Sequence, residues 1–379
     1  MPRKIRVLVV EDSLTVRKRL VEVLAADPEC EVVAEASDGQ AAITLCERLR
    51  PDVITLDMVL PKLDGVAATE HIMAYCPTPI VIVSASYNRG EVMSTLDALA
   101  AGAVDVLEKP DGRADPDEIW SRQFLATVKL ASRIKVITHV RARLRTSQPS
   151  PPPVPGLTAR KSSPPAVTAP LAATPAADPE GRFKLVAIGA STGGPAAVVE
   201  ILRGLPKAFP LPVLLVLHIG KPFGEGFAEW LGNQLPMPVA QAVEGEPLPK
   251  PGRARVVLAR PDRHLVVRDG RLRLTLDAER HSCRPSVDVL FDSVARELGP
   301  AAIGCLLTGM GRDGAEGLLA MRRAGAMTLA QDEASSVVFG MPREAIRLGA
   351  AERVLPLSDF DETLAALARS SEPRKERSS

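Results

Sequence analysis

Short apolar runs alternate with amphipathic stretches along most of this 379-residue chain. In the N-terminal part the runs are rich in Val and Ile and have the length of buried strands. They cover Ile5–Val10, Glu31–Ala36, Val53–Leu56, Ile80–Val83 and Val104–Leu107. Helical periodicity fills the intervals, for example at Ser13–Ala26 and Gly39–Arg48. This alternation predicts an α/β domain built on a doubly wound, five-stranded parallel sheet.

The C-terminal part repeats the alternation with longer intervals. Strands are predicted at Lys184–Ile188, Val213–Leu217, Arg255–Leu258, Ile303–Leu307 and Met327–Ala330, and helices at Pro195–Arg203, Phe223–Gln234, Ser286–Glu297 and Gly314–Arg323. Two further alternating runs, His264–Arg268 and Arg271–Leu276, flank Asp269-Gly270, which is typical of a β-hairpin. We therefore expect a second doubly wound α/β domain.

A segment rich in Pro, Ala, Ser and Thr separates the two parts at residues 149–179. Proline lacks a backbone donor, and such a composition offers little apolar surface to bury, so the segment predicts an extended linker. We expect an N-terminal domain at residues 1–140, a Pro/Ala-rich linker at 141–181 and a C-terminal domain at 182–372.

Composition and charge exclude several classes of function. A net charge of +1 gives no basic face for nucleic acid. No apolar run approaches the roughly 20 residues that span a bilayer, and the N-terminus lacks the pattern of a signal peptide. The five cysteines are scattered without a CxxC pair, which favours reduced thiols. We expect a cytoplasmic protein that binds no nucleic acid and is not inserted in a membrane.

Charged and hydroxyl side chains follow the predicted strands of the first domain. Glu11 and Asp12 end the first strand, Asp57 ends the third, Ser84 ends the fourth, and Lys109 follows the fifth. The carboxyl ends of parallel strands meet at one edge of a sheet. Crowded carboxylates raise one another's cost of ionisation, and Mg²⁺ relieves that repulsion with a hard, oxygen-rich site. An isolated acid at a strand end would more simply cap a helix.

This pattern resembles the flavodoxin-like receiver domain of bacterial response regulators. The resemblance covers about residues 5–122 and implies that a histidine kinase phosphorylates Asp57. It also implies that Glu11 and Asp12, with Asp57, hold Mg²⁺. Ser84 and Lys109 would then sense the new phosphoryl group.

In the C-terminal part, the stretch "LVAIGASTGGPAAV" ends an apolar strand on a tight turn with Ser191 at its tip. It could be a plain strand-to-helix turn, a phosphate cradle or a nucleophile turn. A phosphate cradle is disfavoured because Pro195 follows Gly193-Gly194 and no lysine is present. The dinucleotide pattern fails as well, because Ser191 stands where its second glycine belongs.

A nucleophile needs a base and an orienting acid. His218 follows the strand after Ser191, and Asp313 lies in a glycine-rich turn after a later strand, so the three could meet at one sheet edge. Each also has a simpler interpretation: His218 could bond only to backbone, and Asp313 could cap a helix. The other histidines here, His264 and His281, are compatible with surface or turn positions.

Four motifs in the C-terminal part, "IGASTGG", "RPSVDVLF", "LLTGMGRDGAEGLLAM" and "AQDEASSVVFGMPREAI", closely resemble those of the chemotaxis protein-glutamate methylesterases, the CheB family. The resemblance covers about residues 183–350. It implies a serine hydrolase whose triad is Ser191, His218 and Asp313, with no cofactor for the esterase reaction. The implied substrates are glutamate methyl esters on the cytoplasmic domains of chemoreceptors, with methanol as product, and receptor glutamines for deamidation.

The motifs also suggest residues that contact the substrate. The Met310 backbone amide is the first candidate for the oxyanion hole, since nearby glycines permit a tight turn. Thr192 and Arg284 are further candidates, although Arg284 could instead pair with Asp288 four residues on.

The chain departs from both families at a few positions. Receivers often carry an aromatic switch residue where this chain has Val106. The methylesterases usually have Gln before the catalytic histidine and Met-Pro after it, where this chain has Leu217, Ile219 and Gly220.

A receiver joined to a hydrolase suggests that the unphosphorylated receiver covers the cleft around Ser191 and that phosphorylation of Asp57 loosens it. Two other classes of function stay open: a transcriptional output module and a catalytically inactive scaffold in a related signalling array. A thiol nucleophile at Cys283 beside His281 is disfavoured, because no acid is evident to orient the pair.

Overall fold

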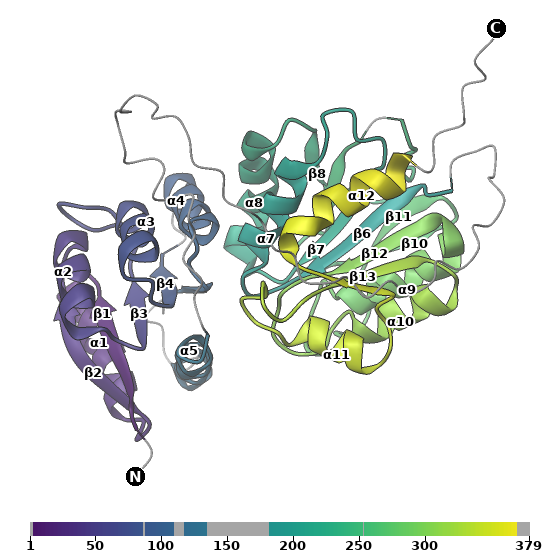
Figure 1. Ribbon diagram of the computed structural model, residues 1–379. Helices are drawn as coiled ribbons and strands as arrows, with labels where there is room; N and C mark the ends of the chain where they lie inside the picture. The colour runs from purple at the N-terminus through teal and green to yellow at the C-terminus, as the bar shows by residue number, and fades with distance from the viewer. Residues whose placement is uncertain (1–2, 86–87, 110–116, 135–181, 253, 370–379) are drawn as a thin grey trace, which may run out of the picture.

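The computed structural model describes residues 3–85, 88–109, 117–134, 182–252 and 254–369. Within these residues the chain forms two parallel sheets flanked by helices, together with one antiparallel hairpin (Figure 1). The α/β class predicted from the alternating pattern is confirmed. The expected linker at 141–181 lies outside the described residues, so the domain boundaries at 140 and 182 stay a prediction.

The N-terminal sheet has five strands in the order β2-β1-β3-β4-β5. Its elements are β1 (Ile5–Val10), α1 (Leu14–Ala25), β2 (Cys30–Ala36), α2 (Gly39–Leu49), β3 (Val53–Leu56), α3 (Gly65–Tyr75), β4 (Ile80–Ser84), α4 (Arg89–Ala100), β5 (Asp105–Glu108) and α5 (Asp117–Ala131). Successive strand residues point to opposite faces. Accordingly, Val7 and Val9 pack with Phe124 of α5 in one core cluster, and Leu8 and Val10 pack in the other.

The C-terminal sheet has seven strands in the order β14-β13-β12-β6-β7-β9-β8, all parallel. Its elements are β6 (Leu185–Ala190), α7 (Gly194–Gly204), β7 (Val213–Leu217), α8 (Lys221–Gln234), β8 (Val239–Gln241), β9 (Val256–Leu258), α9 (Val287–Leu298), β12 (Ala302–Leu306), α10 (Ala315–Arg323), β13 (Met327–Gln331), α11 (Met341–Arg347), β14 (Arg353–Leu355) and α12 (Phe360–Arg369). The predicted hairpin is confirmed as β10 (His264–Arg268) and β11 (Arg271–Thr275), with Asp269 and Gly270 at positive φ.

The order of the strands places a crevice at the carboxyl end of β6. Within the sheet, β7 is the neighbour of β6 on one side and β12 is its neighbour on the other. Loops that leave neighbouring strands in opposite directions open such a crevice, and ligands of doubly wound sheets bind there. The strand-end residues singled out in the sequence therefore lie where this fold places function.

The two α/β units contact each other through α4 on one side and α7 and α8 on the other (Figure 1). Trp230 Nε1 of α8 donates to Asp97 Oδ1 of α4 at 2.8 Å, and Arg89 pairs with Glu229. A Cβ atom added at Gly226 would lie 2.6 Å from Val92, so the two helices approach closely there. These contacts hold the receiver-like unit beside the carboxyl end of β6.

Candidate active site and phosphorylation site

Ser191 and His218 are neighbours at the edge of the C-terminal sheet. Each directly follows one of two adjacent paired strands, β6 and β7. The His218 amide donates to the Ala190 carbonyl at 3.0 Å, and the Ser191 amide donates to Thr308 O at 3.0 Å. The backbone thus brings the nucleophile candidate, the base candidate and the loop after β12 together, as the sequence predicted.

Asp313 lies against the base candidate and the start of helix α9. His218 Nε2 donates to Asp313 Oδ2 at 2.9 Å. The backbone amides of Val287 and Asp288 donate to the same carboxylate at 2.7 and 3.0 Å, and Ser286 Oγ donates to it at 2.7 Å. The first amides of a helix favour negative charge. Asp313 is therefore fixed as a carboxylate and is not a simple helix cap.

The protonation states of His218 and Asp313 depend strongly on each other. Burial alone would raise the pKa of Asp313, but the hydrogen bond and the charge of His218 hold it below its ordinary value. Burial lowers the pKa of His218, but the hydrogen bond to Asp313 and the nearby Cys283 sulfur outweigh burial and raise it to about 9. In this conformation the resting pair at neutral pH is an imidazolium and a carboxylate.

The hydroxyl of Ser191 is adjacent to His218 but is not bonded to it. Among the described residues, no hydrogen bond joins the Ser191 side chain to the imidazole. A Cβ atom at Gly309 would lie 2.8 Å from Ser191 Cβ, so the glycine lets the two loops meet. In free enzymes the bond between nucleophile and base is often long and tightens only with substrate.

The structure brings Cys283 to the imidazole, which sequence reasoning missed. Cys283 Sγ lies 3.9 Å from His218 Nδ1, on the side of the ring away from Asp313. The expectation that no acid orients this region is wrong, because His281 Nε2 lies 3.0 Å from Asp288 Oδ2 and Asp313 orients His218. The loop between the hairpin and α9 carries Cys283 to the end of β7, a path that residue spacing does not reveal.

The three candidate substrate contacts have different surroundings. The Met310 side chain is exposed, and within the described part of the chain its amide donates no hydrogen bond. The Thr192 hydroxyl donates to Asp105 Oδ2 of β5 at 3.0 Å, so it binds the other α/β unit. Arg284 Nη1 donates to Asp277 O at 3.3 Å, and its buried Nε has no partner. Arg284 does not pair with Asp288.

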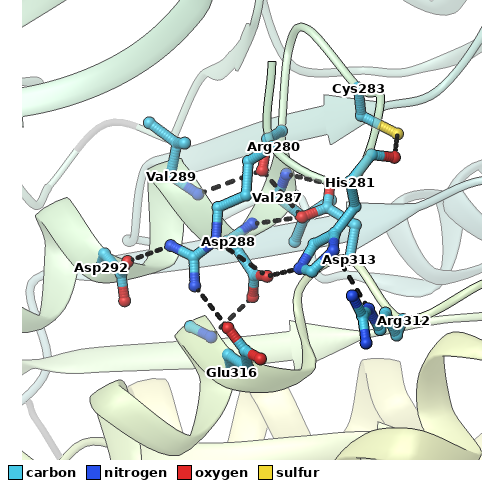
Figure 2. A network of polar contacts seen from close by, with 12 residues as sticks. Arg280, His281, Cys283, Val287, Asp288, Val289, Asp292, Arg312, Asp313 and Glu316 are labelled. Atoms are coloured by element: carbon cyan, nitrogen blue, oxygen red, sulfur yellow. Dashed lines mark hydrogen bonds and ion pairs between the residues drawn. The ribbon is translucent and has the colours of Figure 1, made fainter. Parts of the chain in front are cut away.

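Asp288 belongs instead to a network of polar contacts beside Asp313 (Figure 2). Its carboxylate accepts from the Gly317 amide at 2.6 Å and lies 3.4 Å from Arg280 Nε. Burial raises the pKa of Asp288 to about 6. Arg312 Nε donates to His281 Nδ1 at 3.1 Å, which extends the network to the loop of Asp313 (Figure 2).

A cavity of about 580 Å³ opens next to this network. It is lined by His281, Ser282, Cys283, Met310, Gly311, Arg312, Asp313, Gly340, Arg343 and Glu344. Its lining includes both Asp313 and Met310, whose amide is free of other bonds within the described residues. This cavity is the place where a substrate could approach the sheet edge.

Two buried residues outside the predicted set hold the loops in place. Thr308 Oγ1 donates to Thr192 O at 3.0 Å and accepts from the Val338 amide at 2.9 Å. Gln331 Oε1 accepts from the Thr308 amide at 2.8 Å. Thr308 lies in the motif "LLTGMG" and Gln331 in "AQDEASSVV", but the sequence could not show which polar groups face each other.

The carboxylates of the N-terminal sheet meet as predicted. The Lys109 ammonium lies 2.9 Å from both Glu11 Oε2 and Asp57 Oδ2. The carboxylate oxygens of Glu11, Asp12 and Asp57 lie within 4.8 Å of one another. Ser84 is buried, and its Oγ donates to the following carbonyl at 3.3 Å. These groups form one acidic pocket, in which the Lys109 ammonium contacts both buried carboxylates.

This acidic pocket fits a hard divalent cation. Burial, and then the charge of Asp57, raise the pKa of Glu11 to about 7. Burial also raises the pKa of Asp57. Glu11 Oε2 is buried and accepts no hydrogen bond, since its contact with Lys109 is an ion pair without hydrogen-bond alignment. Crowded carboxylates that repel each other, one of them with a buried oxygen that accepts no hydrogen bond, match the ligand preference of Mg²⁺.

Comparisons with known proteins agree over both units. Residues 186–364 match the family model described as CheB methylesterase, and residues 7–119 match the response regulator receiver domain. A protein-glutamate methylesterase/protein-glutamine glutaminase of Nitrosospira multiformis is 46% identical over 365 residues, which cover 96% of this chain and 97% of that protein. A Myxococcus xanthus protein with the same description, numbered 4, is 43% identical over 97% of this chain and 98% of its own length.

Two solved structures from Thermotoga maritima match the separate units. The CheB methylesterase catalytic domain is 36% identical, with a TM-score of 0.46, and covers 49% of this chain and 98% of its own. The response regulator domain of CheB is also 36% identical, with a TM-score of 0.32, and covers 35% of this chain and 99% of its own. Within the described residues, no helix is long and apolar enough to cross a membrane.

Proposed function

This chain belongs to the family of protein-glutamate methylesterases/protein-glutamine glutaminases that carry a receiver domain, and we propose that Ser191, His218 and Asp313 are its catalytic triad. The activity is hydrolysis of glutamate methyl esters and glutamine amides in a phosphorylation-regulated enzyme of chemotactic adaptation. The observation that supports the triad most is the His218–Asp313 hydrogen bond of 2.9 Å at the sheet edge where Ser191 stands.

The reaction follows from the positions of these groups. Asp313 holds Nε2 of the imidazole, so Nδ1 is the nitrogen that takes the proton of Ser191 as its oxygen attacks the ester carbonyl. The imidazolium then gives that proton to the leaving methoxide, and methanol departs. Water, deprotonated by the same nitrogen, hydrolyses the acyl-serine to a free glutamate. With a glutamine substrate the leaving group is ammonia.

The tetrahedral intermediate needs donors for its oxyanion. The Met310 amide borders the cavity and is free of other bonds within the described residues, so it supplies one donor. One such donor contributes about 3 kcal/mol of transition-state stabilisation. The polar network of Asp288, His281 and Arg312 fixes the loop that carries this amide.

We propose that a histidine kinase supplies the phosphoryl group to Asp57. Mg²⁺ would be held by Glu11, Asp12 and Asp57, where it supplies charge neutralisation for phosphoryl transfer. Lys109, at 2.9 Å from Asp57, contacts the transferred group, and the buried Ser84 hydroxyl lies at the neighbouring strand end.

Regulation is proposed to act through β5. The Gly193 amide donates to Val104 O at 3.2 Å, and Thr192 Oγ1 donates to Asp105 Oδ2 at 3.0 Å. These bonds attach the nucleophile turn to the start of β5, while Lys109 follows its end. A phosphoryl group on Asp57 draws Lys109 into new contacts, shifts β5 and releases the turn.

The substrates are proposed to be methylated cytoplasmic domains of chemoreceptors, and the enzyme is proposed to work in the cytoplasm, where its five free cysteines stay reduced. The proposed domains are residues 1–140 and 182–372, joined by the linker at 141–181.

Release of methanol from methylated receptor tests the triad. We expect Ser191→Ala to lower the phosphorylated rate by at least about 10³-fold, because removing one member disables the whole relay. His218→Gln should be equally inactive, whereas His71→Gln, a partly exposed histidine on the other α/β unit, should keep most of the rate. A Ser191→Ala protein as active as the wild type would exclude this serine as the nucleophile, and a wild type without activity would favour the scaffold.

A further inference from the structure

We propose that His218 and Cys283 form a binding site for a zinc ion that blocks the hydrolase. Cys283 Sγ lies 3.9 Å from His218 Nδ1, both side chains are partly buried, and Cys283 lines the cavity beside Asp313. Thiolate and imidazole are the ligands that zinc prefers. The proposed hydrolysis does not use Cys283, so the position of its sulfur beside the imidazole is open to another role.

The separation of the two atoms matches a bridging ion. Zinc binds nitrogen at about 2.0–2.1 Å and sulfur at about 2.3 Å, so a tetrahedral ion places the two ligand atoms about 3.6 Å apart. The observed 3.9 Å requires only a small closure, which rotation of the Cys283 side chain supplies. Binding releases the thiol proton, and the Nδ1 proton if the ring is charged, to solvent.

The surroundings of the imidazole are those of a metal ligand. Zinc-bound histidines commonly donate their second ring nitrogen to a carboxylate, which fixes the ring and raises its basicity. Here His218 Nε2 donates to Asp313, and that carboxylate is itself held by Ser286, Val287 and Asp288. The nitrogen that faces the sulfur is therefore the one that can bind an ion once it has released its proton.

The remaining ligand positions lie toward the cavity. The His281 carbonyl oxygen lies 3.4 Å from Cys283 Sγ and is one further oxygen donor. Water in the cavity of about 580 Å³ can complete the shell. The site also differs chemically from the all-oxygen pocket at Glu11 and Asp57, so Mg²⁺ and zinc select different halves of the molecule.

Bound zinc occupies the nitrogen that the proposed mechanism uses as a base. The inhibitory consequence therefore rests on the proposed function, but metal binding itself does not. At a free zinc concentration ten times the dissociation constant, about nine-tenths of the enzyme is occupied and methanol release falls about ten-fold.

Cobalt(II) titration of the full-length protein tests the binding separately from activity. We expect a thiolate-to-cobalt charge-transfer band in the wild type, loss of the band in Cys283→Ser, its retention in His281→Gln, and its displacement by zinc. In the methanol assay, zinc should inhibit the wild type about ten-fold and Cys283→Ser less than two-fold, each relative to its own metal-free rate. A chelator should restore the wild-type rate.

Other outcomes overturn the site or the function separately. A band that persists in Cys283→Ser refutes the site and assigns the metal to another thiol. One such thiol is Cys46, whose Sγ lies 3.2 Å from that of Cys76. A band lost only in His281→Gln moves the metal to the His281–Asp288–Asp313 cluster and also refutes it. A cobalt band in a protein without esterase activity upholds the site and refutes the triad. Matching circular dichroism spectra show that each variant is folded.

Discussion

Replacing Thr192 with Val tests whether the receiver restrains the nucleophile turn. The change preserves the shape of the side chain and removes the hydroxyl that donates to Asp105 Oδ2 at 3.0 Å. Hydrogen bonds to charged groups contribute about 1.5–3 kcal/mol. Because the partly buried Asp105 regains water when the units separate, we take the lower value of about 1.5 kcal/mol. Each 1.4 kcal/mol is a tenfold change in an equilibrium, so the released fraction should rise about ten-fold.

The assay is methanol release from methylated receptor, measured with and without a small-molecule phosphodonor such as acetyl phosphate. We expect Thr192→Val to raise the unphosphorylated rate about ten-fold and to leave the phosphorylated rate nearly unchanged, so that the activation ratio falls. The phosphorylated rate reports any direct damage to catalysis. Thr192→Ser is the matched control, because it keeps the hydroxyl that donates to Asp105 and should preserve the ratio. An unchanged ratio in Thr192→Val would refute the restraint.

Three further predictions concern the charge of His218 and the support of Asp313. The pKa of His218 is raised to about 9 and the base must be neutral, so the unphosphorylated rate should climb about ten-fold from pH 7 to 8 and about five-fold from pH 8 to 9; a flat profile would contradict this. Because the pKa of His218 is raised in the folded protein, its charged form stabilises the fold fully below pH 6.5, and this stabilisation is lost as pH rises through about 9. The loss of stability from His218→Gln in denaturant titrations should therefore be larger at pH 6 than at pH 10. Ser286→Ala removes the 2.7 Å bond to Asp313 and a helix cap, and should lower the free energy of unfolding by about 2 kcal/mol and kcat about ten-fold. Ser286→Thr keeps the hydroxyl and should restore both, and a full loss in Ser286→Thr would point to packing instead.

Much of the fold was predictable because buried parallel strands are continuous apolar runs. β3 was predicted with its bounds as Val53–Leu56, and the strand-end positions of Ser191 and His218 follow directly from β6 and β7. The short edge strands β8 and β14 were not predicted. Each has only three residues, none of them buried, so neither leaves an apolar run in the sequence.

The finer geometry depends on side chains and loops that spacing does not determine. Strand adjacency predicted that Ser191 and His218 could meet at one sheet edge. Among the described residues no hydrogen bond joins the Ser191 hydroxyl to the imidazole, because strand adjacency does not determine a side-chain rotamer. The approach of Cys283 to the imidazole depends on a loop path after the hairpin. The bond from Thr192 to Asp105 joins separate units, and no periodicity within either one can predict it.

The short strand β5 connects the proposed phosphorylation site on one sheet with the proposed nucleophile on the other. Asp105 begins β5 and contacts the turn of Ser191, while Lys109 follows β5 and contacts Asp57. At about 3.3 Å per residue, the strand places the two contacts roughly 13 Å apart. Val106, where many receivers have an aromatic switch, is buried and too small to relay the signal by swinging out. Displacement of the strand itself, driven by the new partner of Lys109, is therefore the route that this chain offers for the signal.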